Sequence, residues 1–210
     1  MLANVYVDGF NLYYSCIKDT PYRWLNLLQL CQLCFPHHTI RRIRYFTARV
    51  RATDSDPQKP QRQALFIRAL QTLPNLSVHY GTFLTHTVTM RLANPPPRGP
   101  YTADVVRTEE KGSDVNLASY MLVDGFDRDY ELAIVVSNDS DLVEPIRLVR
   151  ERLGLSVGLL NPQMDEHKTA WALMKAATFY RTIRRGVLQA SQFPPILSDA
   201  HGQFFKPPTW

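Results

Sequence analysis

One strand–helix–strand unit in the second half of the chain constrains the fold more than any other feature. Residues 131–136 (ELAIVV) are a short apolar run typical of a buried strand, and residues 156–160 (SVGLL) are another. Between them, residues 142–153 place apolar side chains at helical spacing. Strands joined in this way lie parallel in one sheet, with a right-handed crossover and with helices on both faces. The pattern therefore predicts an α/β fold with a mainly parallel central sheet.

The remaining segments add further strands and helices. Apolar and β-branched runs predict strands, and apolar side chains at helical spacing predict helices. The expected strands are residues 2–7, 40–48 and 76–80, and the expected helices are residues 11–17, 24–35, 60–73, 112–126 and 170–177. Because serine is a preferred N-cap residue, Ser113 is expected to cap the helix over residues 112–126.

Two segments depart from this pattern. Residues 81–92 alternate as in an extended arm or hairpin and lead into ANPPPRGP (residues 93–100), whose prolines predict an exposed loop. After residue 178 the pattern fades into a short, irregular, proline-containing tail, which either lies across the body or docks on a partner. We therefore expect one domain over residues 1–178, with an insertion at about 81–103, and a C-terminal extension over residues 179–210.

The composition bounds the partners and the compartment. The chain has 24 Lys and Arg against 19 Asp and Glu, a formal net charge of +5, which favours a polyanion such as nucleic acid. No run of about 18 apolar residues and no signal-peptide pattern occurs, so we expect a cytoplasmic protein without a membrane partner. Three cysteines are an odd count that does not suggest a disulfide framework and fits a reducing compartment.

Carboxylates follow two of the expected strands. Asp8 comes directly after the first strand, and Asp139 and Asp141 come after ELAIVV in the stretch VVSNDSD. In an open parallel sheet, ligands bind outside the carboxyl ends of the strands. Asp114 lies in the first turn of a helix, where negative charge is favoured, but spacing alone leaves open whether that helix end faces the same edge.

These acids have two interpretations. If they converge, their mutual repulsion must be relieved by protonation or by a metal ion, and an all-oxygen ligand set favours Mg²⁺ or Mn²⁺. Each acid taken alone is equally well explained as the cap of a turn or a helix.

Three motifs resemble a known family. In this order, VYVDGFNL (residues 5–12), EEKGSDVNL (residues 109–117) and VSNDSDL (residues 136–142) are similar to motifs of the NYN domain family, PIN-like nucleases that include the bacterial LabA-like or DUF88 proteins. The resemblance covers about residues 3–162. It implies a three-layer PIN-like α/β fold with an acidic Mg²⁺ or Mn²⁺ centre that hydrolyses RNA phosphodiester bonds.

The resemblance also assigns roles to particular residues. The matching acids, implied as catalytic residues and metal ligands, are Asp8, Asp114, Asp139 and Asp141. Glu110 stands where some members carry an additional acid and is a further candidate ligand. Asn11 matches the polar residue of the first motif, and Asn138 stands where the family often has glycine; both are candidate substrate-binding residues.

Other side chains are candidates for contacting RNA. Arg49 and Arg51 follow the expected strand over residues 40–48 and are the favoured phosphate contacts, although a scattered solvated surface explains the basic residues about as well. Tyr13 and Tyr14 are able either to stack on a base or to pack on the face of their own helix.

Cys31 and Cys34, followed by His37 and His38, look like a zinc site. Both cysteines fall on the apolar face of an expected helix, however, so we favour buried thiols and surface histidines over a metal site.

Two functions remain open at this point. The first is a metal-dependent endoribonuclease acting on single-stranded RNA. The alternative is a catalytically weak or inactive NYN module that binds RNA or a protein partner, or forms a homo-oligomer, through the loop over residues 93–100 or through the C-terminal tail.

Overall fold

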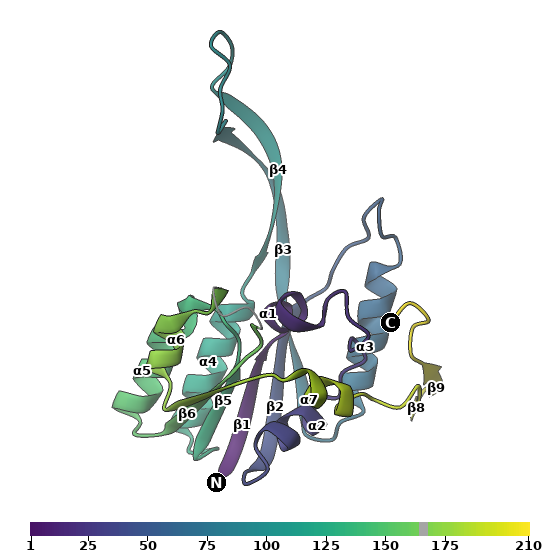
Figure 1. Ribbon diagram of the computed structural model, residues 1–210, viewed down its shortest axis with the longest axis vertical. Helices are drawn as coiled ribbons and strands as arrows, with labels where there is room; N and C mark the ends of the chain where they lie inside the picture. The colour runs from purple at the N-terminus through teal and green to yellow at the C-terminus, as the bar shows by residue number, and fades with distance from the viewer. Residues whose placement is uncertain (164–167) are drawn as a thin grey trace.

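The computed structural model describes residues 1–163 and 168–210 and contains a central sheet of seven strands in the order β4-β3-β2-β1-β5-β6-β7 (Figure 1). The strands are β1 (Leu2–Asp8), β2 (Thr39–Ala48), β3 (Leu76–Arg91), β4 (Thr102–Lys111), β5 (Leu132–Val136), β6 (Ser156–Asn161) and β7 (Phe179–Thr182). All neighbouring pairs are parallel except β3 and β4, which are antiparallel. The predicted α/β fold with a mainly parallel sheet is confirmed.

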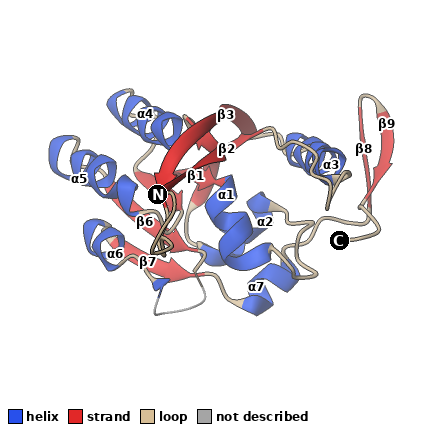
Figure 2. Ribbon diagram, turned by 90° about the horizontal axis from the view of Figure 1, so that it is seen from above, coloured by secondary structure: helices blue, strands red, loops and turns tan. Residues whose placement is uncertain are grey.

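Helices cover both faces of the sheet and complete three layers (Figure 2). One face carries α1 (Gly9–Leu12) with its π-helical continuation η1 (Tyr13–Ile17), α2 (Leu27–Cys34), α3 (Lys59–Gln71) and α7 (Arg185–Ala190). The other face carries α4 (Ser113–Phe126), α5 (Val143–Arg152) and α6 (Trp171–Ala176), with a 3-10 turn η2 (Ser140–Leu142) before α5.

Successive residues of β1 face opposite layers. Val5 and Val7 lie in the core beneath α2 and α3, whereas Tyr6 lies in the core beneath α4 and α5. A strand that is buried on both faces carries apolar side chains without alternation, which explains the continuous apolar runs in the sequence.

The strand order has a switch point at β1. The chain runs outward through β1, β2 and β3, and then returns to the other side of β1 to add β5, β6 and β7. Ligands of open α/β sheets bind in the crevice at such a point, beyond the carboxyl ends of the strands. Asp8 is the last residue of β1 and therefore lies at this crevice.

Beyond the sheet, β3 and β4 continue as a two-stranded arm that projects from the body (Figure 1). Their pairing runs from Thr82 opposite Lys111 to Arg91 opposite Thr102, so the predicted hairpin is confirmed and the proline-rich loop lies at its tip. Because β4 returns the chain to the body, α4 begins at the base of the arm.

The segment after residue 178 is more regular than the sequence suggested. It adds β7 to the sheet, then α7, and then the hairpin of β8 (Ile196–Asp199) and β9 (Gly202–Phe205). Asp199 accepts two hydrogen bonds from Arg68 of α3, at 2.7 Å each. The rings of Phe193 and Phe204 are buried and meet Trp24 edge-on, so the tail lies across the body.

The expected cap of α4 is wrong. Gly112 is the N-cap residue, with φ of 99°, and Ser113 is the first helical residue. The side chain of Glu110 reaches forward from β4 and accepts hydrogen bonds from both the backbone N–H and the hydroxyl of Ser113. A carboxylate that precedes the helix thus replaces the serine cap.

Within residues 1–163 and 168–210, no helix combines the length and the apolar composition needed to cross a bilayer.

Candidate metal centre

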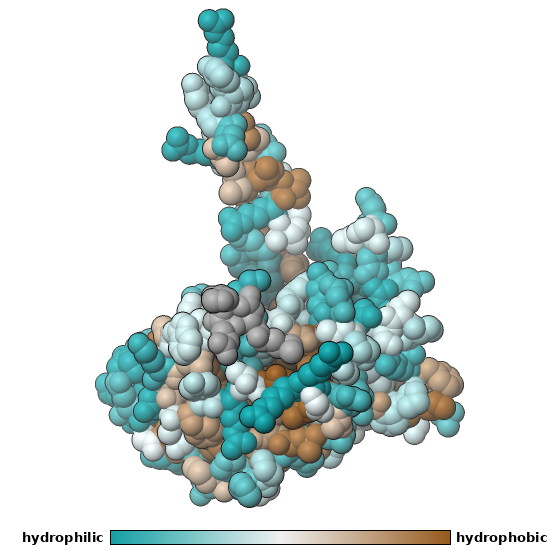
Figure 3. Space-filling model, in the orientation of Figure 1, coloured by the Kyte–Doolittle hydropathy of each residue, from teal (hydrophilic) through white to brown (hydrophobic). Residues whose placement is uncertain are grey.

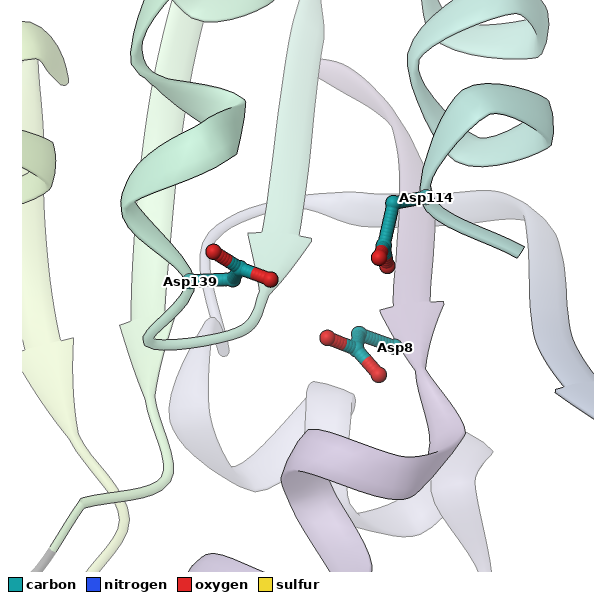
Figure 4. A group of neighbouring side chains, drawn as sticks. All are labelled: Asp8, Asp114 and Asp139. Carbon is teal, nitrogen blue, oxygen red and sulfur yellow. The ribbon is translucent and has the colours of Figure 1, made fainter. Parts of the chain in front are cut away.

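Three carboxylates meet at the switch point of the sheet (Figure 4). Asp8 comes from the end of β1, Asp114 from the first turn of α4, and Asp139 from the loop after β5. Each of them offers one carboxylate oxygen, and these three oxygens all lie within 4.8 Å of one another. The structure thus places the first turn of α4 at the sheet edge, which spacing alone had left open.

Asp8 is fixed by hydrogen bonds to both of its oxygens. Its Oδ1 accepts the backbone N–H of Asn11 at 2.9 Å, as the N-cap of α1, and its Oδ2 accepts the hydroxyl of Ser137 at 3.0 Å. Burial raises the pKa of the Asp8 carboxyl, and these hydrogen bonds offset part of that rise. Asp8 is therefore held in place at some electrostatic cost.

Ser137 also positions Asp139. Its Oγ accepts the backbone N–H of Asp139 at 3.0 Å, while Oδ1 of Asp139 accepts the backbone N–H of Asp141, also at 3.0 Å. Ser137 is completely buried between the ends of β1 and β5. One hydroxyl thus connects two of the three acids.

The environment of Asp114 strongly raises the pKa of its carboxyl. Burial, together with the negative charges of Asp8, Asp139, Glu110 and Asp141, raises the pKa of its carboxyl to about 6. The cluster therefore lacks positive charge, and either a proton or a cation relieves the repulsion.

The three acids fit a hard divalent cation. All the ligand atoms on offer are carboxylate oxygens, which Mg²⁺ and Mn²⁺ prefer over nitrogen or sulfur. Their mutual spacing allows one ion to contact one oxygen from each residue.

Asp141 and Glu110 lie outside this set. Asp141 is exposed in the turn η2, and Glu110 uses its two oxygens to hold Ser113 at 3.1 Å and 2.5 Å. Both acids still add negative charge near Asp114.

Asn11 and Asn138 brace the loops around the acids. The side-chain oxygen of Asn11 accepts the backbone N–H of Asn138 at 2.9 Å. The Asn138 amide in turn bonds to the backbone of Lys168 and Ala170, at 2.8 Å each. Their role in binding substrate stays a prediction.

A cleft of about 820 Å³ opens above the acids. Arg51 and Lys59 supply its positive charge, and Phe10, Tyr14 and Phe83 supply aromatic surface. Arg49 does not line the cleft, and its guanidinium lies over the ring of Tyr80, 4.8 Å from the centroid.

Ser137 and Phe83 were not singled out by the sequence. Ser137 stands inside the third motif, so its position was a usable signal. Phe83 belongs to the alternating stretch at the base of the arm, and only the fold brings it to the cleft.

The cysteine motif is not a metal site in this fold. Cys31 and Cys34 are buried in the core, and burial raises the pKa of both thiols. Within the described part of the chain they form no metal-binding group with His37 or His38.

A three-layer, mainly parallel α/β domain with an acidic cluster at its switch point is a nuclease-type fold of the PIN-like class. The chain belongs to the NYN domain family, whose model matches residues 3–184.

The proteins similar to this chain include a relative from Pseudomonas and a solved structure from Vibrio. A protein of Pseudomonas putida (strain DSM 28022 / S16), named 6-hydroxy-3-succinoylpyridine 3-monooxygenase HspA, is 29% identical over an alignment of 238 positions, which covers 99% of this chain and 75% of that protein. A crystal structure of a protein of unknown function, VPA0982 from Vibrio parahaemolyticus RIMD 2210633, matches with a TM-score of 0.52 at 16% identity, covering 88% of this chain and 93% of the other. The second likeness concerns the fold alone.

Proposed function

We propose that this protein is a metal-dependent endoribonuclease that hydrolyses phosphodiester bonds of single-stranded RNA. The observation that carries the proposal is the convergence of Asp8, Asp114 and Asp139 within 4.8 Å on the floor of an open cleft, in a chain of the NYN family. The acidic floor and the cationic rim are opposite in charge, as expected where a metal ion and a polyanion meet.

In this proposal, the acidic residues of the cleft bind the metal ion and its basic residues contact the RNA backbone. Asp8, Asp114 and Asp139 would hold Mg²⁺ or Mn²⁺, and Asp141 and Glu110 add negative charge around them. When bound, such an ion lowers the pKa of a coordinated water and offsets the charge that develops on the phosphoryl group. Arg51 and Lys59 would contact the backbone phosphates on either side of the scissile bond.

Single-stranded RNA is favoured over a duplex because aromatic rings line the cleft. Unpaired bases stack on exposed rings, whereas bases inside a duplex are already stacked on one another. The proposal includes a cytoplasmic location, which the three free cysteines favour.

The proposal is tested by incubating a fluorescently labelled single-stranded RNA with the protein in Mn²⁺, in Mg²⁺ and in EDTA. Cleavage is expected with a divalent ion only, and it should vanish in both Asp8→Asn and Asp139→Asn. Asp127→Asn, an exposed acid at the end of α4, is the matched control and should cleave normally. Cleavage that survives both substitutions at the centre would rule the proposal out.

The alternative is a catalytically weak or inactive NYN module. It predicts salt-sensitive retention of RNA with no cleavage in any divalent ion. A protein partner or a second copy would contact the arm more readily than the tail, because Phe193, Phe204 and Trp210 of the tail pack on the body. Leu84, Met90 and Val106 are exposed on the arm, where Figure 3 shows apolar surface. Light scattering on the full chain separates a monomer from a homo-oligomer.

A second candidate function comes from the Pseudomonas relative, whose name describes a monooxygenase acting on 6-hydroxy-3-succinoylpyridine. The observation that favours it is a smaller cavity beside the cleft, lined by aromatic rings together with Lys59 and Arg62, which suits a small aromatic acid. Incubating the protein with this compound, oxygen and an electron donor, and measuring by mass spectrometry whether the compound is consumed and which products form, tests this candidate.

A further inference from the structure

We propose that the smaller cavity, of about 390 Å³, is a subsite that binds one base of the RNA strand next to the scissile phosphate. This inference rests on the proposed endoribonuclease function and adds to it the group that anchors the substrate. The cavity is not separate from the acidic cleft. Phe10, Tyr14, Val50, Thr53 and Lys59 line both openings.

One wall of the cavity is a cluster of aromatic rings on a single helical face. Phe10, Tyr13 and Tyr14 follow one another at i, i+3 and i+4 along α1 and η1, a spacing that places side chains on the same side. The rings of Phe10 and Tyr14 are stacked, 6.5 Å apart at 22°, and Tyr13 meets Tyr14 edge-on at 5.1 Å. Tyr14 remains 54% exposed, so its ring is available to a base.

Two further rings, one buried and one partly buried, complete the aromatic lining of the cavity. Tyr45, from β2, is only 6% exposed, and Trp210 reaches the cavity from the segment after β9. Trp210 is held by an edge contact with the ring of Trp24 at 6.2 Å and by a tilted contact with the ring of Phe66 at 5.8 Å. Because both rings are already packed, a ligand that enters the cavity has fewer side chains to order on binding.

A cationic side chain lies between the cavity and the cleft, where we expect the phosphate attached to the bound base. Lys59 lines both openings and makes no ion pair within residues 1–163 and 168–210, whereas Arg62 is already paired with Asp56. Lys59 is thus the cation that stands between the aromatic cavity and the acids. A base in the cavity with its phosphate at Lys59 directs the next phosphate toward Asp8.

The size and the polar lining favour one base of any kind. The volume lies in the range of pockets that hold small ligands. The Gln63 amide, the one side-chain amide among the residues that line the cavity, is occupied with the backbone of Val50 at 2.9 Å and Ala48 at 2.8 Å. Stacking without hydrogen-bond readout tolerates every base.

Binding of a fluorescent RNA dodecamer, measured by anisotropy in Ca²⁺ so that cleavage is not the readout, tests the inference. Stacking of one base is worth about 1–3 kcal/mol, so Tyr14→Ala should weaken binding by about 5- to 150-fold, and Tyr14→Phe should bind normally. Tyr180→Ala, which removes a ring that is 50% exposed on β7, is the matched control and should have no effect.

An abasic dodecamer of equal charge completes the test. The wild-type protein should bind it more weakly than RNA, and Tyr14→Ala should bind the two strands with nearly equal affinity. Equal RNA affinity of the wild type and Tyr14→Ala would overturn the subsite while leaving the cleavage proposal intact. Weaker RNA binding by Tyr14→Ala, together with no RNA cleavage by the wild type in Mn²⁺, would support the subsite and overturn the cleavage proposal. Saturation of the cavity by 6-hydroxy-3-succinoylpyridine without any loss of RNA binding would also overturn the subsite.

Discussion

The hydroxyl of Ser137 donates a hydrogen bond to Oδ2 of Asp8 at 3.0 Å, across the boundary between β5 and β1. The Oγ of Ser137 also accepts the backbone N–H of Asp139 at 3.0 Å. Two acids that are far apart in the sequence are therefore positioned by one buried side chain. Ser137 is a positioning residue, because it touches the acids and not the proposed substrate.

Ser137→Ala should weaken divalent-ion binding by about 10- to 100-fold, as is typical when a group that orients metal ligands is lost. The substitution removes a hydrogen bond that lowers the pKa of Asp8, so that pKa should rise and half-maximal Mn²⁺ binding should move to higher pH. Calorimetric titration with Mn²⁺ at several pH values measures both effects. Ser140→Ala, in the exposed turn η2, should bind Mn²⁺ normally. Unchanged affinity in Ser137→Ala would contradict the positioning role.

Asp114 makes the stability of the metal-free protein depend on pH. Its pKa is raised from 3.8 to about 6, so the folded protein holds this proton more tightly than the unfolded chain does. The free energy of unfolding should therefore fall as pH rises from 3.8 to about 6, and the loss should be complete above that pH.

Asp114→Asn should accordingly stabilise the protein in EDTA at pH 7.5, by on the order of 1 kcal/mol after allowance for solvent screening of a half-exposed group. The gain should disappear near pH 4, where the wild-type carboxyl is protonated. Adding Mn²⁺ at pH 7.5 should raise the melting temperature of the wild type and have little effect on the variant. A variant that is destabilised in EDTA, or that responds to Mn²⁺ like the wild type, would argue against the cluster.

The positions of Asp8 and Asp139 could be predicted from the sequence because both follow buried parallel strands, and the carboxyl ends of such strands share one edge. Asp114 could not be placed in this way. Its helix begins where β4 returns from the arm, and the length of an arm is not encoded in local periodicity. Asp141 and Asp139 looked equivalent in the sequence, but the turn η2 leaves Asp141 exposed.

The packing of the tail also could not be predicted from local sequence patterns. Phe193, Phe204 and Trp210 lie far from Trp24 in the sequence, yet all three rings pack around it. Composition could indicate that aromatic residues in the tail would be buried, but no local pattern tells which surface receives them. For this reason the sequence indicated only Tyr13 and Tyr14 as aromatic residues of the cavity, and it did not indicate the ring that the tail contributes.

A buried ion pair anchors α4, the helix that carries Asp114. Arg44 of β2 donates two hydrogen bonds to Asp124, at 2.7 Å each, and Tyr6 donates a third at 2.8 Å. The side chains of Arg44 and Asp124 are only 11% and 7% exposed. Removing one partner leaves the other charge buried without compensation.

Asp124→Ala should therefore lower the free energy of unfolding by about 3–5 kcal/mol, measured by urea denaturation. The double variant Arg44→Met/Asp124→Leu should be more stable than Asp124→Ala, since no uncompensated charge remains. Asp127→Ala, one turn later and exposed, should change stability by less than about 0.5 kcal/mol. If Asp124→Ala cost no more than Asp127→Ala, the pair would not anchor the helix.

Gly81 lies where β3 leaves the sheet and becomes the arm, and its missing side chain lets Glu110 reach Ser113. A Cβ at this position would lie 2.0 Å from Oε1 of Glu110 and 2.7 Å from the backbone oxygen of Lys111. Gly81→Ala must therefore displace Glu110 and the end of β4, and with them the first turn of α4. We expect a loss of about 1–3 kcal/mol in the free energy of unfolding, together with weaker Mn²⁺ binding as Asp114 moves away from Asp8.

Gly186 provides the matched control for this substitution. It lies inside α7, and a Cβ there would meet nothing within 4 Å. Gly186→Ala should stabilise the protein by about 0.4–1 kcal/mol, because alanine restricts the unfolded chain and fits a helix, and Mn²⁺ binding should not change. Comparing the two alanine variants by urea denaturation and Mn²⁺ titration separates a general glycine effect from a displaced carboxylate. Normal Mn²⁺ binding in a destabilised Gly81→Ala would show that the base of the arm does not set the geometry of the acids.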